Sequence, residues 1–312
     1  MKVSIIIRCY NEEEHIGKLL TGIFHQKNAD FEVILVDSGS TDSTLFIASK
    51  FDVKVLKIRP EDFSFGYALN VGCAAASGDV LLFASAHVYP LYTDWLSLMA
   101  QPFINDEKVA LVYGKQRGDY RNKFSEHQIF AQWFPEVSNY NQQIPFCNNA
   151  NCAVRQSIWQ THKFDEQLTG LEDLMWAKQI QKMGYRIAYE SKATIIHIHE
   201  ENAAIISNRY KREAIALKKI NPENTFTFID FCRLLLINIV HDLKVAFKQG
   251  ELLENLQDIF MFRYNQFLGT YNGYKETETS LSKTIRKKYY YPPSKQDYST
   301  KVEGQDVIKY NE

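Results

Sequence analysis

The sequence lacks an excess of charge, a long apolar run and a regular cysteine pattern. Its 36 Lys and Arg residues balance 37 Asp and Glu residues, so the protein has no net positive electrostatic field that would favour a nucleic-acid partner. No run of about 18 uncharged apolar residues occurs, and we therefore expect no membrane-spanning helix. The five cysteines form no CxxC pair and no metal-ligand spacing, and an odd count without a signal peptide fits a reducing cytoplasm.

The rest of the chain is organised around the first forty-odd residues. A short apolar run, Val3–Ile7, is followed by a helical pattern over residues 16–23 and by a second apolar run, Phe31–Val36. This strand–helix–strand order predicts a parallel pair of strands with a right-handed crossover. Ligands of such sheets bind outside the carboxyl ends of the strands. The polar segments Tyr10–Glu12 and Asp37–Asp42 are expected at that edge.

These two polar segments, at this separation, resemble the opening of family 2 inverting glycosyltransferases of the GT-A fold, the type that builds bacterial surface polysaccharides. The resemblance covers roughly the first 200 residues. It implies an α/β, GT-A-like (Rossmann-like) fold, with a mostly parallel sheet flanked by helices. It also implies that Cys9, Tyr10, Asn11, Glu12 and Asp37 hold the nucleotide of an activated sugar.

The region after the second strand predicts a third strand over residues 53–58 and a helix over residues 67–76. In the resembling enzymes this helix flanks the nucleotide, so Asn70 is expected to face it. Asp62 and Ser64 precede the helix and suit its N-cap region, since both side chains satisfy free backbone amides there. That structural role and a place beside the donor can coexist.

The apolar strand Val80–Ala84 ends at Ser85-Ala86-His87. In most relatives this position carries an Asp-x-Asp motif whose last carboxylate holds a divalent cation against the donor diphosphate, and both carboxylates are missing here. Imidazole ligates Mn²⁺ or Zn²⁺, whereas Mg²⁺ prefers oxygen. His87 is therefore a metal ligand, a hydrogen-bond donor to phosphate, or part of a metal-free site. Mn²⁺ and Mg²⁺ both stay open as cofactors.

Residues 186–189 and 194–198 are predicted strands, and His197 and His199 lie at the end of the second one. His197 and His199 share one face of an extended chain, because side chains alternate with a period of two. In metal-dependent relatives a histidine after this strand completes the coordination of the cation. We expect His199, at the end of the strand, to be that ligand, although a histidine in a strand is often structural.

Two further segments match the family. Three asparagines between residues 148 and 151 resemble the segment beneath the donor sugar, and Asn149 is the expected sugar contact; a tight turn is the alternative, since Asn tolerates turn geometry. Glu172 and Asp173 match the Glu-Asp motif at a helix start, in which the second acid is the catalytic base. Acids also favour the first turn of any helix. We expect Asp173 to deprotonate the acceptor and Glu172 to contact the donor.

The last third of the chain carries two amphipathic stretches, at 225–247 and 252–268, and a basic aromatic segment at 283–293. We divide the chain into a catalytic domain, 1–220, and a helical region, 221–312, with a polar tail. The helices either cover the catalytic domain and form a homodimer contact or lie on anionic lipid at the inner face of the plasma membrane, and the basic segment favours the membrane.

The resemblance implies a cytoplasmic enzyme that moves a sugar from a nucleotide-sugar donor to the hydroxyl of a glycan or lipid-linked acceptor. Two alternatives stay open. A sugar-1-phosphate nucleotidyltransferase shares the architecture, but no Gly-rich phosphate loop with a basic residue occurs near the amino terminus. A non-catalytic nucleotide-sugar-binding or scaffold protein would account for the missing carboxylates at 85–87.

Overall fold

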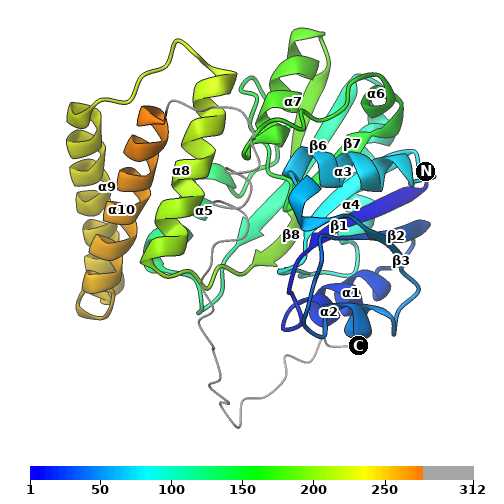
Figure 1. Ribbon diagram of the computed structural model, residues 1–312, viewed down its shortest axis with the longest axis horizontal. Coiled ribbons are helices and arrows are strands. Elements are labelled where there is room, and N and C mark those ends of the chain that lie inside the picture. Colours follow the sequence, from blue (N-terminus) through cyan, green and yellow to red (C-terminus); the bar gives the residue numbers. More distant parts are fainter. Residues whose placement is uncertain (277–312) are drawn as a thin grey trace.

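The computed structural model describes residues 1–276, and its centre is one mixed sheet of eight strands (Figure 1). The strand order is β3-β2-β1-β4-β7-β6-β8-β5. Six strands run in one direction, while β5 and β7 run against them. The strands are β1 Val3–Cys9, β2 Phe31–Asp37, β3 Lys54–Lys57, β4 Val80–Ser85, β5 Val88–Pro90, β6 Val109–Arg117, β7 Asn151–Arg155 and β8 Arg186–His197.

Helices cover both faces of this sheet. The apolar side chains of α1, α2 and α4 pack on one face, and those of α3, α6 and α7 pack on the other. The helices are α1 Ile16–Phe24, α2 Thr44–Ala48, α3 Phe65–Ala74, α4 Trp95–Asn105, α5 Phe124–Trp133, α6 Gln156–Thr161, α7 Glu172–Lys182, α8 Ala203–Ile220, α9 Phe228–Gln249 and α10 Leu252–Lys275.

The first strand explains why the fold has two cores. Ile5 and Ile7 point to the core that contains α1 and α4, whereas Ile6 points to the core that contains α3. Successive side chains of a strand alternate between faces, so a strand buried on both faces is apolar throughout. The predicted parallel pairing holds, since β1 pairs with β2 and with β4 in parallel register. Cys9, Asp37 and Ser85 therefore end their strands at the same edge.

Several local expectations meet the structure here. Ser64 caps α3 by accepting a hydrogen bond from the Tyr67 amide at 3.1 Å, which confirms its N-cap role. The two strands expected between residues 186 and 198 are one strand, β8, because pairing with β6 continues through a bulge. The helix α8 was not expected from the sequence.

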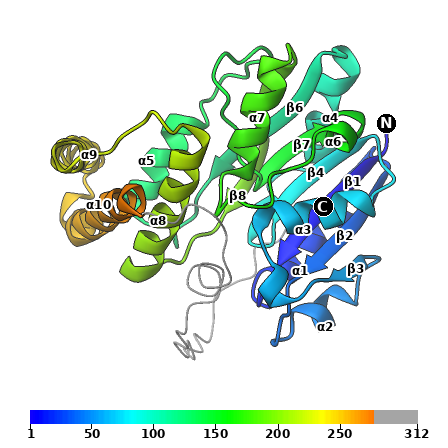
Figure 2. The ribbon, with the colours of Figure 1, turned by 45° about the horizontal axis from the view of Figure 1, so that its top comes forward.

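The three C-terminal helices form a layer beside the sheet. In Figures 1 and 2, α10 lies between α9 and α8, and α8 is the one nearest the sheet. Two glycines of α10 permit this close contact. A Cβ atom at Gly269 would lie 2.3 Å from the Ser207 carbonyl oxygen, and one at Gly273 would lie 2.5 Å from that of Lys211. The expected basic segment, 283–293, and the polar tail lie outside the described residues.

A buried ion pair joins this helical layer to α5. The Arg263 guanidinium donates to both carboxylate oxygens of Asp242, at 2.7 and 2.9 Å, and the Ser125 hydroxyl donates to the same carboxylate at 2.6 Å.

Within residues 1–276, no helix is both long enough and apolar enough to pass through a bilayer.

Candidate active site

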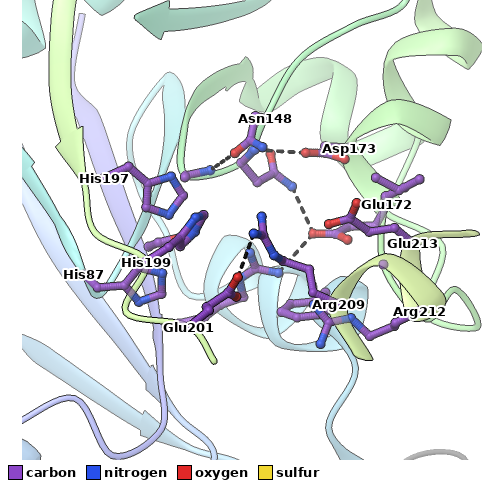
Figure 3. Close-up of a pocket in the computed structure, with 17 residues that line it drawn as sticks. His87, Asn148, Glu172, Asp173, His197, His199, Glu201, Arg209, Arg212 and Glu213 are labelled. Atoms are coloured by element: carbon purple, nitrogen blue, oxygen red, sulfur yellow. Dashed lines mark hydrogen bonds and ion pairs between the residues drawn. The ribbon is translucent and has the colours of Figure 1, made fainter. Parts of the chain in front are cut away.

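Two adjoining cavities open at the carboxyl edge of the sheet. The larger, of about 260 Å³, and the smaller, of about 150 Å³, share Arg8, Phe65, Ser85 and His87 in their walls. The larger one is drawn in Figure 3, with three histidines on one side and two acids of α7 on the opposite side. The shared residues make the two cavities parts of one cleft.

The loops that follow β1 and β2 are bonded to each other. The Asn11 amide donates to Ser40 Oγ at 3.0 Å, and Asn11 Oδ1 accepts from the Thr41 amide at 2.8 Å. The Asp37 carboxylate accepts from the amides of Gly39 and Ser40, each at 3.1 Å. Asn11 has a φ of 53°, a left-handed conformation that Asn adopts more readily than most residues. The predicted nucleotide-binding edge is thus held in shape without a ligand.

The expected nucleotide contacts fall into two groups. Cys9, Tyr10 and Glu12 line the smaller cavity. Asn11 and Asp37 are absent from the described cavity walls and shape the loops behind them. Burial, together with the nearby Asp37 carboxylate, raises the pKa of the Cys9 thiol far above its usual value, so this side chain stays protonated.

Asn70 takes a structural position. Its Oδ1 accepts from Trp159 Nε1 and from the Phe164 amide, each at 3.1 Å. Its Nδ2 donates to the Phe164 carbonyl at 3.0 Å and to Glu166 at 2.8 Å. All four hydrogen bonds hold the segment before α7, and Asn70 lines neither described cavity. We therefore do not carry it into the proposed donor site.

The segment Ser85-Ala86-His87, which stands in the place of Asp-x-Asp, faces both cavities. Ser85 and His87 line the two of them, and the buried Ala86 lines the smaller one. His87 Nδ1 lies 2.9 Å from a carboxylate oxygen of Glu12. Burial alone would lower the pKa of His87, but the Glu12 carboxylate outweighs it and the pKa is raised.

His87, His197 and His199 form one cluster, in which a ligating atom from each lies within 4.8 Å of the other two. The sequence singled out His87 and His199, and the structure adds His197. Its ring stacks on that of His87, with centroids 5.2 Å apart. The signal for His197 was the two-residue period that places it beside His199. This cluster is the candidate site for a divalent cation.

The two acids of α7 share their hydrogen bonds with Asn149. The Asn149 amide donates to Asp173 Oδ2 at 2.9 Å, and its side-chain Nδ2 donates to Glu172 Oε1 at 3.1 Å. Glu172 Oε1 also accepts from Arg8 Nη1 at 2.9 Å. Asn149 Oδ1 is buried and has no hydrogen-bond partner among the described residues. That oxygen is ready to accept a hydrogen bond from a bound hydroxyl group.

The carboxyl group of Asp173 has a pKa far above its ordinary value. Burial, and then the charge of Glu172, raise its pKa to about 7, against the opposing effect of the two backbone amides that donate to it. Leu171, the residue before α7, has a φ of 55°, which is rare for a residue other than glycine. This strained turn lets α7 begin with both acids facing the cavity, as Figure 3 shows.

Several residues of the cleft were not anticipated. Arg209 and Arg212, from α8, line the larger cavity together with Glu201 and Glu213. Arg8 and Arg212 both lie over the Phe65 ring, at 4.6 and 4.8 Å from its centroid. Their spacing of three residues puts Arg209 and Arg212 on one helix face, but that signal had value only once α8 was recognised.

Lys115 and Arg117 follow a strand predicted over residues 109–113, where the sequence allows either contact with a phosphate or an anionic acceptor or plain surface charge. Lys115 and Arg117 both form ion pairs with the exposed Glu136, and neither lines the described cavities. This arrangement agrees with the alternative that they are surface charges.

Comparison with known proteins gives a consistent picture. TarS of Staphylococcus aureus, a poly(ribitol-phosphate) β-N-acetylglucosaminyltransferase, is 27% identical over 277 residues, which are 86% of this chain and 46% of TarS. The O-antigen chain rhamnosyltransferase WbaN of Salmonella anatum is 28% identical over 185 residues, covering 56% of this chain and 58% of WbaN. The chain thus spans about half the length of these relatives.

Solved structures share the fold. The mannosyltransferase PcManGT of Pyrobaculum calidifontis, in complex with GDP-Man and Mn²⁺, has a TM-score of 0.61 at 18% identity and covers 88% of this chain and 87% of its own. Residues 1–349 of S. aureus TarS with UDP-GlcNAc have a TM-score of 0.54 at 23% identity, covering 84% and 73%. Both likenesses concern the GT-A fold.

The family model described as glycosyl transferase family 2 matches residues 4–162, about half of the chain. Together with the glycosyltransferase relatives, this match lends no support to a nucleotidyltransferase. The chain belongs to glycosyl transferase family 2.

Proposed function

We propose that this enzyme transfers a sugar from a nucleotide-sugar donor to an acceptor hydroxyl with inversion, and that Asp173 is the catalytic base. One observation carries the proposal: a buried carboxylate with a pKa of about 7 lines the cleft that continues to the strand ends of β1 and β4. A general base works best when its pKa is near the working pH. In a single in-line displacement, the acceptor hydroxyl loses its proton as it attacks the anomeric carbon, and Asp173 takes that proton.

The donor would lie along the cleft. Cys9, Tyr10 and Glu12 would hold the nucleotide in the smaller cavity, with Asn11 and Asp37 fixing the loops around it. The diphosphate would lie beside Ser85, Ala86 and His87. The sugar would reach the larger cavity, where the unpartnered Asn149 Oδ1 accepts from a sugar hydroxyl and Glu172 fixes the Asn149 side chain.

We also propose that a divalent cation meets the donor diphosphate at His87 and His199. The ligand chemistry fits, since imidazole nitrogen suits Mn²⁺ and other first-row dications. When bound, the cation would neutralise the developing charge of the leaving nucleoside diphosphate. The acceptor would be a glycan or lipid-linked acceptor, in line with the names of two relatives, which give poly(ribitol-phosphate) for TarS and the O-antigen chain for WbaN.

A separate surface bears on location. Helices α9 and α10 carry a set of exposed large apolar side chains, and we propose that these side chains contact a membrane surface at the cytoplasmic face. The members of this set are Phe228, Ile229, Leu236, Ile237, Val240, Phe247, Leu253, Leu256, Phe260 and Tyr264. Co-sedimentation with anionic vesicles tests this membrane contact. A homodimer seen by light scattering, without vesicle binding, would instead assign these side chains to a dimer interface.

The transferase proposal is tested with a panel of nucleotide sugars that includes UDP-GlcNAc and GDP-Man. Thermal-shift measurements identify the donor, because a ligand that binds only the folded state raises the melting temperature. Release of nucleoside diphosphate and the anomeric configuration of the product, read by NMR, then establish inverting transfer. Pyrophosphate release from a nucleoside triphosphate, or binding without turnover, would contradict the proposal.

A further inference from the structure

We infer that His87, His197 and His199 together form a three-imidazole site that selects a first-row transition-metal dication, Mn²⁺, Co²⁺ or Zn²⁺, over Mg²⁺. The role of this ion against a diphosphate rests on the proposed function. Binding of the ion itself does not, since all three ligands belong to the protein.

The three side chains converge because β5 pairs with β8. Val88 lies opposite His197 in this antiparallel pair, and the Ile198 amide donates to the His87 carbonyl at 3.1 Å. This pairing brings the loop after β4 onto the end of β8. The ligating atoms lie within 4.8 Å of one another. Two nitrogens on one ion, each at about 2.1 Å from it, lie at most about 4.2 Å apart. Small ring rotations cover that difference.

In each of the three rings, Nδ1 is hydrogen-bonded to another side chain of the protein. His87 Nδ1 lies 2.9 Å from Glu12 Oε1, and His199 Nδ1 lies 2.6 Å from Glu126 Oε1. Carboxylate oxygens only accept, so both Nδ1 atoms carry the proton. Metal-ligating histidines almost always donate their second ring N–H to such an acceptor, which fixes the tautomer and the ring orientation.

His197 follows the same pattern through an amide. Its Nδ1 lies 2.8 Å from Gln116 Oε1. The Gln116 orientation is fixed from the other side, because its Nε2 donates to Asn148 Oδ1 at 3.2 Å, and that oxygen also accepts from the Ala150 amide. Gln116 therefore presents an oxygen to His197, and the His197 Nδ1 carries the proton. In all three rings the Nε2 lone pair is left for a ligand.

An independent observation points to a missing ligand. His197 is 5% exposed, lines the larger cavity, and its Nε2 has no hydrogen-bond partner among the described residues. A buried polar atom without a partner is uncommon and often marks an ion or a water.

The donor set decides the kind of ion. Once a bound ion has displaced any proton from Nε2, the three imidazoles supply nitrogen and no negative charge, whereas Mg²⁺ requires hard oxygen ligands and gives up its water reluctantly. Imidazole suits the first-row series, with affinity rising from Mn²⁺ toward Cu²⁺. The loss of both carboxylates of Asp-x-Asp thus changes the selectivity of the site without abolishing cation binding.

The test uses the full chain, stripped with chelator, and Mn²⁺ alone, without donor. Pulsed EPR should detect ¹⁴N couplings from coordinated imidazole, and a large excess of Mg²⁺ should leave them in place. His197→Ala and His87→Ala should each weaken Mn²⁺ binding by more than the roughly 10–100-fold typical of losing an outer-shell partner. The exposed His241 of α9 provides the matched control, and His241→Ala should leave binding unchanged.

Other outcomes overturn the inference. Mn²⁺ bound without nitrogen coupling, displacement by equimolar Mg²⁺, or unchanged affinity in His197→Ala would each exclude the three-imidazole site. Melting curves without metal identify a misfolded variant, and His87→Ala, at a half-buried position, then decides. Asp173→Asn should keep Mn²⁺ binding. Transfer that persists in chelator would overturn the role of the ion against the diphosphate and leave the transferase proposal standing.

Discussion

The stability of Asp173→Asn relative to that of the wild type should increase as the pH rises. Asp173 ionises near its usual value of 3.8 in the unfolded chain but only at about 7 in the folded protein. Between these values the unfolded state binds fewer protons than the folded state, so the stability of the wild type falls with rising pH. An asparagine side chain does not ionise in this range, so Asp173→Asn does not lose stability in this way as the pH rises.

The size of the effect follows from the pKa. One pKa unit corresponds to about 1.4 kcal/mol, so the two units between pH 5 and pH 7 give about 2–3 kcal/mol. The variant also has a cost that does not depend on pH. Both oxygens of Asp173 accept from backbone amides, those of Asn149 and Leu174, and an Asn side chain has only one acceptor. Leaving one amide unpaired costs about 1–3 kcal/mol at every pH.

Urea unfolding at pH 5, 6, 7 and 8 measures this difference. The stability of Asp173→Asn minus that of the wild type should grow by about 2–3 kcal/mol from pH 5 to pH 7 and then level off. Asp94→Asn, at an exposed acid before α4, should follow the wild type at every pH. Parallel curves for the wild type and Asp173→Asn would refute the reasoning, because they would mean that Asp173 ionises in the folded protein as it does in water.

Three further outcomes are expected. The pH profile of kcat/KM should rise with a midpoint near pH 7 as Asp173 becomes the carboxylate that accepts the proton; a flat profile from pH 6 to 8 would contradict this. Asp242→Ala should lower the free energy of unfolding by about 3–5 kcal/mol, because it leaves the Arg263 charge buried and unpaired. Asp258→Ala breaks a surface pair and should cost less than about 1 kcal/mol, and equal losses would contradict the distinction. Gly269→Ala should destabilise by about 1–3 kcal/mol because its Cβ would meet an α8 carbonyl oxygen, and unchanged urea midpoints would count against that close contact.

The parts of the fold that the sequence predicted are those with local causes. Val3–Ile7 and Phe31–Val36 are apolar throughout and flank a helical period, so their parallel pairing and the shared edge at Asp37 followed from chain order. The two strands expected at 186–189 and 194–198 flank Glu190-Ser191-Lys192, which interrupts the apolar pattern of β8. Pairing with β6 overrides that local signal, since strand formation depends on neighbours as much as on composition.

The parts of the site that escaped prediction depend on contacts distant in sequence. Arg209 and Arg212 reach the cleft only because α8 packs between α10 and the sheet. The two-residue period places His197 beside His199, but only the structure shows that its Nε2 is buried without a hydrogen-bond partner among residues 1–276. Asn70 shows the opposite case, because the family pattern placed it beside the nucleotide and its amide is used within the protein.

The central claim is that the Asp173 carboxylate removes the proton of the acceptor in a sugar transfer. The most direct test measures the transfer rate and the donor affinity of Asp173→Asn side by side with those of Asp94→Asn. Loss of a general base typically costs about 10²–10⁴-fold in rate. We expect a fall of this size in Asp173→Asn with donor affinity unchanged, and no fall in Asp94→Asn. Transfer at the wild-type rate in Asp173→Asn would contradict the account.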